Sequence, residues 1–199
     1  IPLRLVGSEM CIRDRYFAKL RKEYQYLAHK FGLKPMDYKL WRFLRLRPQN
    51  FPHIRISQLA YLYHQRRASL SQLLETYSVK DAKEVLATAV TPYWETHYTF
   101  GSTSVRNDKN LSPFSLNLLC INTVVPILFA YGRHRGEEKY CDRAFDFLEQ
   151  LKPENNHIIR LWQQCGLVVE NAGDSQALIQ LKKEYCDKKE CLRCRFGYE

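Results

Sequence analysis

The sequence has little of several features that define common protein classes. No uninterrupted apolar run approaches the ~20 residues that a membrane-spanning helix needs, and the most apolar stretch, LNLLCINTVVPILFAYG, contains two asparagines and a proline. Apolar and polar residues nowhere alternate for more than a few positions, so we expect no substantial β-sheet. The segment FGSTS has a single glycine and no lysine, unlike a phosphate-binding loop. We therefore expect a helical protein with no membrane partner.

Cysteine is scarce outside the end of the chain. The total of seven is odd, and the sequence has no recognisable secretory signal, which argues against a disulfide framework. We therefore expect a reducing, cytoplasmic location. Three of the cysteines, Cys186, Cys191 and Cys194, lie close together in the stretch YCDKKECLRCRFGYE.

The spacing C-x4-C-x2-C of these cysteines favours a bound metal. Two intervening residues allow two thiolates to face one ion while the backbone turns around it. A structural zinc site and an iron–sulfur cluster both usually need four ligands. The candidates for the fourth position are Cys165, Cys141 and His157. The sequence leaves zinc, an iron–sulfur cluster and three unligated thiols as alternatives.

Positive charge is in excess and partly clustered. The chain has 31 Lys and Arg against 21 Asp and Glu, a net charge of +10, which favours a polyanionic partner. Trp41, Tyr61 and Tyr63 interleave with the clustered arginines, and arginine with aromatic residues can bind phosphates and stack on bases. The alternative is a solvated helix face with aromatic residues in the core. The clustered arginines are Arg42, Arg45, Arg47, Arg55, Arg66 and Arg67.

The first fifteen residues, IPLRLVGSEMCIRDR, do not resemble the start of a domain. They have no initiator Met and no periodicity, and EMCIRDR looks like the translation of a sequencing adapter. We set residues 1–15 aside as an assembly artefact, together with Cys11. We expect residues 16–185 to form one helical domain and residues 186–199 to form a cysteine-rich tail packed on it.

Helical periodicity dominates the first part of that domain. Apolar residues spaced from Phe17 to Phe31 predict a helix that Gly32 ends. MDYKLWRFLRLR, residues 36–47, predicts a second helix that ends before Pro48, and residues 54–67 predict a third. We expect Ser69 or Ser71, and then Asp81, to cap the next two helices.

Further helices follow an irregular segment around TPYWETHYTFGSTS. Ser112 and Pro113 predict the start of a long apolar helix, which Pro126 should kink or break. EEKYCDRAFDFLEQLK and PENNHIIRLWQQCG each predict a helix, and Asp174 or Ser175 should cap the last one. The expected fold is all-α, an irregular bundle of roughly eight helices with a small cysteine-rich knuckle at its C-terminus.

Several long stretches resemble one uncharacterised bacterial family, domain of unknown function 2851. They include WRFLRLRPQNFPHIRISQLA, PYWETHYTFGSTS, INTVVPILFAYGRHRG and DSQALIQLKKEYCDKKECLRCRFG. The resemblance implies a helical fold, a bacterial cytoplasmic setting and a cysteine triplet shared by the family. It also implies that this chain corresponds to the C-terminal half of longer proteins, whose missing upstream half resembles a restriction-endonuclease-like core. The family has no assigned activity, so the resemblance implies no catalytic residues.

Three hypotheses for function follow. The first is a helical module that accompanies the missing nuclease-like half and binds DNA or RNA through the clustered arginines. The second is a scaffold or protein-interaction domain whose arginines pair with its own acids. The third is an enzyme acting through the loops RPQNFPHIR and FGSTS, with His53 or His97 as acid–base, although we expect no catalysis from this stretch alone.

Overall fold

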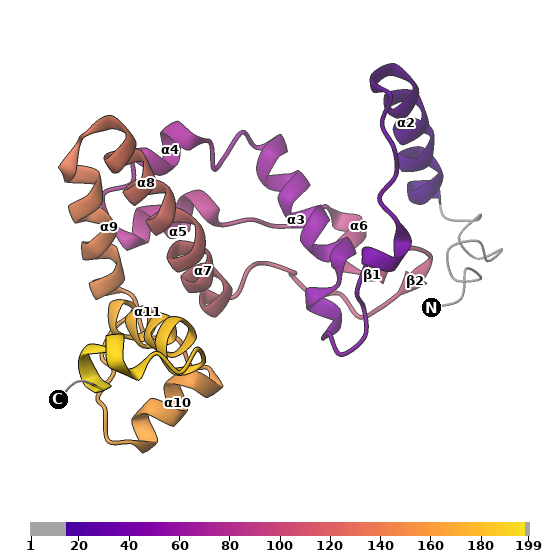
Figure 1. Cartoon of the computed structure of the whole chain (residues 1–199). Coiled ribbons are helices and arrows are strands. Elements are labelled where there is room, and N and C mark those ends of the chain that lie inside the picture. The colour runs from indigo at the N-terminus through magenta and orange to yellow at the C-terminus, as the bar shows by residue number, and fades with distance from the viewer. Residues whose placement is uncertain (1–14, 198–199) are drawn as a thin grey trace. The chain divides into compact units, whose positions relative to one another are not determined.

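The computed structural model describes residues 15–197, which are mostly helical (Figure 1). The one sheet among these residues is a short antiparallel pair, β1 (His97–Thr99) and β2 (Ser102–Thr103). The predicted all-α fold is confirmed. The proposed artefact at residues 1–15 lies almost wholly outside the described residues, so its status stays a prediction.

Contacts divide the chain into two compact units, whereas the sequence predicted one helical domain over residues 16–185. Unit 1 comprises Ile1–Arg66 and Thr88–Leu111, and unit 2 comprises Arg67–Ala87 and Ser112–Glu199. The chain therefore passes from one unit to the other three times. Each unit brings together segments that are distant in sequence.

Unit 1 has a small core made largely of aromatic residues. Ile54, Val90 and Trp94 are buried, and the rings of Tyr93 and Phe100 pack against them. Its elements are α2 (Arg15–Phe31), η2 (Tyr38–Leu40), η3 (Pro48–Asn50), α3 (Pro52–His64), α6 (Pro92–Glu95), β1 and β2.

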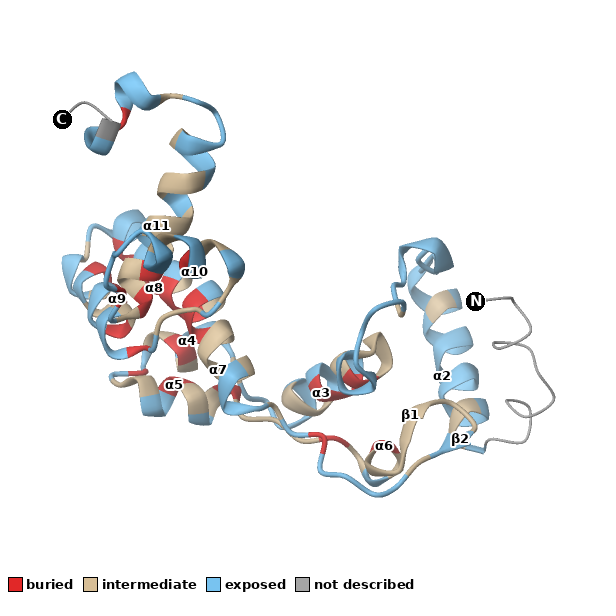
Figure 2. Ribbon diagram, turned by 90° about the horizontal axis from the view of Figure 1, so that it is seen from below, coloured by how far each residue is buried: buried red, intermediate tan, exposed pale blue. Residues whose placement is uncertain are grey.

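Helix α2 forms where the periodicity predicted it. It ends at Gly32, whose φ of +62° is a left-handed conformation that glycine adopts readily. None of its residues is buried, and it is predominantly exposed in Figure 2.

The helix predicted over residues 36–47 is wrong. The structure has only the 3-10 turn η2 there, begun by the Asp37 side chain, which accepts a hydrogen bond from the Lys39 N–H at 3.0 Å. The rest is irregular and turns at Arg45, whose φ is +61°. Leu40 and Leu44 are 67% and 86% exposed. An amphipathic helix is stabilised mainly by packing its apolar face, and these leucines have no such packing.

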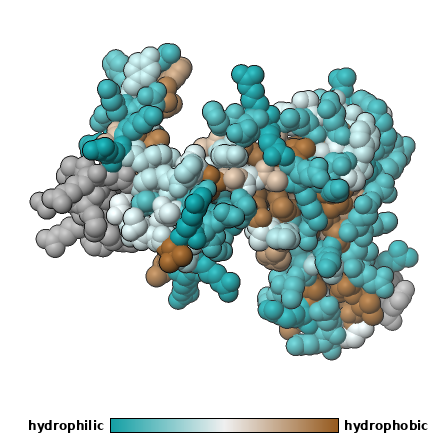
Figure 3. Space-filling model, turned by 180° about the vertical axis from the view of Figure 1, so that it is seen from behind, coloured by the Kyte–Doolittle hydropathy of each residue, from teal (hydrophilic) through white to brown (hydrophobic). Residues whose placement is uncertain are grey.

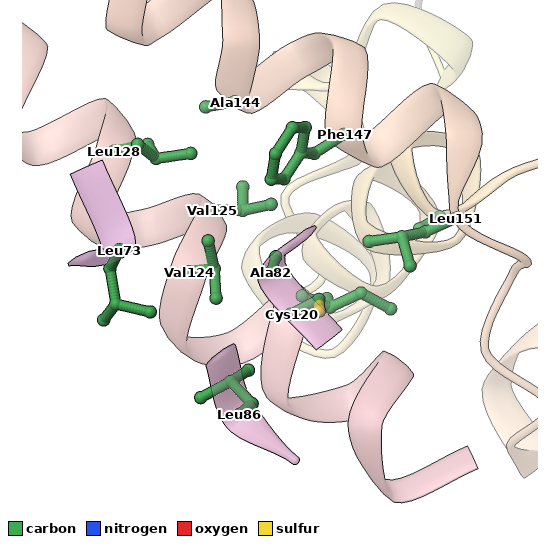
Figure 4. Close-up of a cluster of buried hydrophobic side chains, with 12 residues drawn as sticks. Leu73, Ala82, Leu86, Cys120, Val124, Val125, Leu128, Ala144, Phe147 and Leu151 are labelled. Carbon is green, nitrogen blue, oxygen red and sulfur yellow. The ribbon is translucent and has the colours of Figure 1, made fainter. Parts of the chain in front are cut away.

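Unit 2 contains the larger hydrophobic core, formed around Phe147, Leu128, Val124 and Cys120 (Figure 4). These side chains come from two long helical segments that pack against each other and against a shorter helix, α5 (Val79–Leu86). The elements of unit 2 are α4 (Leu70–Leu74), α5 (Val79–Leu86), α7 (Pro113–Leu119), η4 (Cys120–Val124), α8 (Val125–Arg135), α9 (Glu138–Gln150), α10 (His157–Gln164), α11 (Ala172–Leu181), η5 (Lys182–Cys186), η6 (Cys191–Arg193) and η7 (Arg195–Gly197).

Two predicted caps are confirmed. The Ser69 side chain caps α4 and the Ser112 side chain caps α7, where Pro113 occupies the first turn.

The other two predicted caps are wrong by three or four positions. Ser78 caps α5 and Asn171 caps α11. Asp81 and Asp174 each lie three residues inside the helix and accept a hydrogen bond from the N–H of the capping residue. This reciprocal capping box starts each helix one turn earlier than we expected.

The helix that we expected Pro126 to kink or break is continuous from Pro113 to Arg135, with a local change of winding just before Pro126. The π-helical turn η4 lies between α7 and α8, and Pro126 stands in the first turn of α8. A π turn widens the helix locally, and proline cannot donate the main-chain hydrogen bond that a regular helix would require. The helical stretch Pro113–Arg135 is the only one in the described chain that is long and apolar enough to cross a membrane. Its residues Cys120, Val124 and Leu128 lie in the unit 2 core.

Helices α8 and α9 form a tight hairpin that requires two glycines. Gly136 ends α8 with φ of +69°. Gly132 is buried, and a Cβ atom there would lie 2.8 Å from the Cys141 Sγ and 2.9 Å from the main-chain oxygen of Glu137. The absence of a side chain at Gly132 therefore allows α8 and α9 to approach closely.

We expect Gly132→Ala to lower the free energy of unfolding of unit 2 by about 1 to 3 kcal/mol, because the added methyl group overpacks the hairpin. Urea denaturation of the purified chain measures this change. Ala130→Ser, at an exposed position of the same helix, should change stability by less than about 0.5 kcal/mol. Equal stabilities for the two variants would show that the hairpin tolerates a side chain at Gly132.

Candidate nucleic-acid interface

The two units differ in charge. Unit 1 contains 16 Lys and Arg against 6 Asp and Glu, while unit 2 contains 15 of each, so the whole net charge of +10 lies in unit 1. Between residues 15 and 66 there are twelve basic residues and two acidic ones, Glu23 and Asp37. An excess of this size on one small unit favours association with a polyanion.

Three of the predicted arginines, Arg42, Arg45 and Arg47, lie in the irregular segment between η2 and η3. All three are exposed, and so are Tyr38 and Trp41 just before them. The N–H of Leu46 donates to the main-chain oxygen of Phe43 at 3.3 Å, which closes a turn. Arg45 stands at the third position of this turn, where its positive φ would normally favour glycine.

Two more of the predicted arginines belong to α3 or follow it. The Arg55 guanidinium donates to the Gln58 Oε1 at 2.9 Å and to the Asn50 Oδ1 at 2.6 Å, which ties η3 to α3. Burial lowers the pKa of Arg55. Arg66 is exposed and follows the end of α3 with φ of +52°, so it also occupies a position at which glycine is usual.

The sixth arginine, Arg67, belongs to unit 2. Its guanidinium donates to the main-chain oxygen of Glu84 near the end of α5.

Arg55 and Arg67 therefore hold backbone segments together, while Arg42, Arg45, Arg47 and Arg66 have exposed side chains. Among the described residues, none of these four pairs with a carboxylate, because every ion pair found there uses another basic residue. Those pairs are formed by Lys80, Arg106, Lys139, Lys182, Lys188 and Arg193.

Sequence reasoning missed the basic residues of α2 and the turn after it. Lys19, Arg21, Lys22, Lys30 and Lys34 are all exposed. The signal that could have found them was the local excess of twelve basic residues over two acidic ones. The arginine pattern directed attention to residues 42–67, where five of the six arginines belong to the same unit.

A buried lysine that the sequence did not indicate holds the segment leading to the hairpin. Lys109 is 3% exposed, and its ammonium donates to the main-chain oxygens of Trp94, Glu95 and His97. It also lies 3.9 Å from the centre of the Tyr98 ring. Burial lowers the pKa of Lys109, and the nearby Glu95 carboxylate partly opposes this change. Lys109 therefore organises a segment that has few regular backbone hydrogen bonds.

The loops RPQNFPHIR and FGSTS, named in the enzyme hypothesis, do meet in unit 1. The His53 ring lies 5.3 Å from the Phe100 ring and 5.9 Å from the Trp94 ring. His53 Nδ1 is buried and has no hydrogen-bond partner within the described chain, and burial lowers the pKa of His53. His97 stacks on Tyr93 at 3.9 Å. These contacts give both histidines a packing role.

The predicted metal ligands are not brought together. No three His, Cys, Asp or Glu side chains within residues 15–197 are arranged to hold a metal ion. Cys186 at the end of η5 and Cys191 at the start of η6 are exposed, while Cys194 is buried. The described residues therefore show no ready-made metal site, and zinc or iron–sulfur binding stays a prediction from the spacing alone.

The candidates for the fourth ligand are also dispersed. Cys165 is exposed after α10, and His157 is exposed at the start of α10. Cys141 is buried in α9, where its Sγ lies 3.7 Å from the main-chain oxygen of Phe129. Cys141 therefore packs against α8.

Fold and charge together define a helical protein with one strongly basic unit and one neutral unit. The chain matches the family described as "Protein of unknown function (DUF2851)" over residues 5–157, and it belongs to this family. The matched range includes all six predicted arginines. It begins inside the segment that we set aside and ends before the cysteine triplet, so the match does not extend to those cysteines. No curated protein and no solved structure matches the chain.

His53 should make the stability of unit 1 depend on pH. In the unfolded chain His53 takes up a proton around pH 6.5, whereas burial lowers its pKa in the folded chain. The unfolded state then binds more protons just below pH 6.5, so stability falls as the pH falls through this range. The slope from this one group cannot exceed about 1.4 kcal/mol per pH unit.

Urea denaturation of the purified chain at neutral and mildly acidic pH, followed by the fluorescence of its tryptophans, two of which lie in unit 1, measures this slope. We expect His53→Phe to flatten it, because phenylalanine fills the aromatic site and does not titrate. His64→Asn, at the exposed end of α3, should keep the original slope. An unchanged slope in His53→Phe would assign the pH dependence to other groups.

The metal prediction is tested by elemental analysis and absorption spectroscopy on protein prepared without oxygen. If the cysteine spacing indicates a site, the protein should contain one equivalent of zinc, or iron with a visible absorption band. Cys191→Ser should lose that metal without unfolding the chain, because Cys191 is exposed. Metal-free wild-type protein would leave three unligated thiols as the correct interpretation.

Proposed function

We propose that unit 1 binds DNA or RNA through the exposed arginines Arg42, Arg45, Arg47 and Arg66. The observation that carries the proposal is that the whole net charge of +10 lies in this unit, where these four arginines have no carboxylate partner among the described residues. Arginine side chains that are not already neutralised can replace the counterions around phosphates, which supplies most of the affinity of sequence-independent binding.

Exposed aromatic residues in the same segment support a single-stranded ligand. Tyr38 and Trp41 are exposed beside Arg42, and aromatic rings next to arginines can stack on unpaired bases of any kind. We expect contacts to phosphates and base faces rather than to the edges of particular bases. The protein should therefore bind single strands with little sequence preference.

The scaffold hypothesis requires the clustered arginines to pair with acids of the same chain. Only Arg55 and Arg67 of the six have side-chain hydrogen bonds among the described residues, and their acceptors are amide and main-chain oxygens. Their contacts explain local stability. Within residues 15–197 the four exposed arginines make no such contact, which favours an external anion. A nuclease-like upstream half stays a prediction from the family resemblance.

Arg45 and Arg66 allow binding to be separated from folding. Both have positive φ, which costs a non-glycine residue about 1 kcal/mol or more. Arg45→Gly and Arg66→Gly should therefore keep or raise the stability of unit 1. Each should also weaken binding to a fluorescent single-stranded oligonucleotide, and each should reduce the slope of log affinity against log salt concentration by about 1.

Lys189→Gly is the matched control. Lys189 also has positive φ, +57°, but it belongs to the neutral unit 2. This variant should gain stability in the same way and keep the original affinity and salt slope. The proposal is wrong if the wild-type chain shows no affinity at low salt, if affinity does not change with salt, or if both unit 1 variants bind as well as the control.

A further inference from the structure

Helix α2 carries a narrow apolar stripe that the described residues of unit 1 leave largely exposed. Its apolar residues lie at positions 17, 20, 24, 27 and 31, and this alternation of three and four residues is the seam of a coiled coil. Phe17 packs against Phe100 of unit 1, with ring centres 5.0 Å apart. The other four residues, which we call the free stripe, are 36–61% exposed; they are Leu20, Tyr24, Leu27 and Phe31.

The free stripe stands beside hydrophilic side chains on the same helix. Apolar side chains are exposed on α2 in Figure 3, at the upper left, next to hydrophilic ones. A helix that lies in a membrane surface has a broad apolar face, which would be wider than the free stripe of α2. A seam of this width fits one other helix.

The free stripe is complementary to a second copy of itself in the antiparallel direction. When two α2 helices are crossed at the midpoint between residues 25 and 26, Leu20 faces Phe31 of the second copy. Tyr24 then faces Leu27 of the second copy. By symmetry, each of these two contacts occurs twice in the pair of helices. A two-fold interface requires a patch that matches itself in this way.

The charged residues beside the stripe also match in this direction. Glu23 and Lys30 occupy equivalent flanking positions one heptad apart, so Glu23 of each copy faces Lys30 of the other. Arg21 faces Ala28, which brings no like charges together. In a parallel pair Glu23 would face Ala28 and the ion pairs would be lost. The remaining basic residues of the helix, such as Lys19 and Lys22, lie at outward positions of the heptad.

From this match we infer that α2 is a dimerisation helix that forms an antiparallel pair with α2 of a second copy. One helix from each copy buries less than the ~1,200 Å² of a standard stable interface, and the charge of +10 on unit 1 repels a second unit 1. The dimer is therefore weak, and added salt strengthens it by screening this repulsion. Salt has the opposite effect on nucleic-acid binding, so the two proposals can fail independently.

Sedimentation velocity over a wide range of protein concentrations, at low and moderate salt, tests the proposal. The wild-type chain should show a monomer–dimer equilibrium that shifts toward dimer with salt. Leu27→Glu should be monomeric under all conditions, because it places a carboxylate in the seam. Gln25→Glu introduces the same group at an outward position of the same helix and should still dimerise. Circular dichroism confirms that both variants keep their helices.

Exchange of the flanking charges tests the antiparallel geometry. Glu23→Lys and Lys30→Glu should each weaken the dimer, since each places like charges across the interface. The double variant restores both ion pairs in reverse and should dimerise like the wild type. A wild-type chain that is monomeric at every concentration overturns the proposal. A double variant that is no better than the single variants overturns it as well, because the helices would then not pair in this register.

Discussion

Unit 1 depends on the ammonium group of Lys109, because the unit has little aliphatic core. Its buried hydrophobic cluster consists of Ile54, Val90 and Trp94, whereas the corresponding cluster of unit 2 has twelve buried members. Lys109 donates to three main-chain oxygens in the segment that leads into the hairpin, which places Trp94 and Phe100 where they pack on α3 residues. A buried ammonium that satisfies several carbonyls can thus replace part of the backbone pairing that a larger sheet would provide.

The small hydrophobic core of unit 1 also explains why its surface carries exposed apolar side chains. A helix whose apolar side chains cannot all be covered leaves some of them exposed, as on α2, and the irregular segment from 41 to 47 is held chiefly by turns. Basic side chains are tolerated on such a surface because they remain solvated. Unit 1 therefore offers partners both positive charge and apolar contact, while unit 2 balances its charges and encloses most of the buried apolar residues.

Local patterns in the sequence correctly predicted those structural features that depend on neighbouring residues. The period of α2, its end at Gly32, a cap at Ser69 or Ser71, the Ser112 cap and an irregularity at Pro126 were all predicted, since each depends on contacts within one or two helical turns. The predicted helix over residues 36–47 failed because its apolar residues needed a surface to pack against. The Asp81 and Asp174 caps failed because an aspartate at the third helical position of a capping box resembles a capping aspartate in sequence.

The sequence by itself determined the helical class, the family and the total charge, since these follow from residue types and short-range spacing. Only the tertiary structure decided that the excess charge belongs to one unit, because that unit joins residues 88–111 to the first 66 across an intervening segment. It also decided which arginines are available to bind an external anion. Arg55 and Arg67 look like the other four in the sequence, but their guanidinium groups already donate hydrogen bonds within the chain. The acceptors are Asn50, Gln58 and the main-chain oxygen of Glu84. A side chain's partners depend on the path of the whole chain, which short-range patterns do not specify.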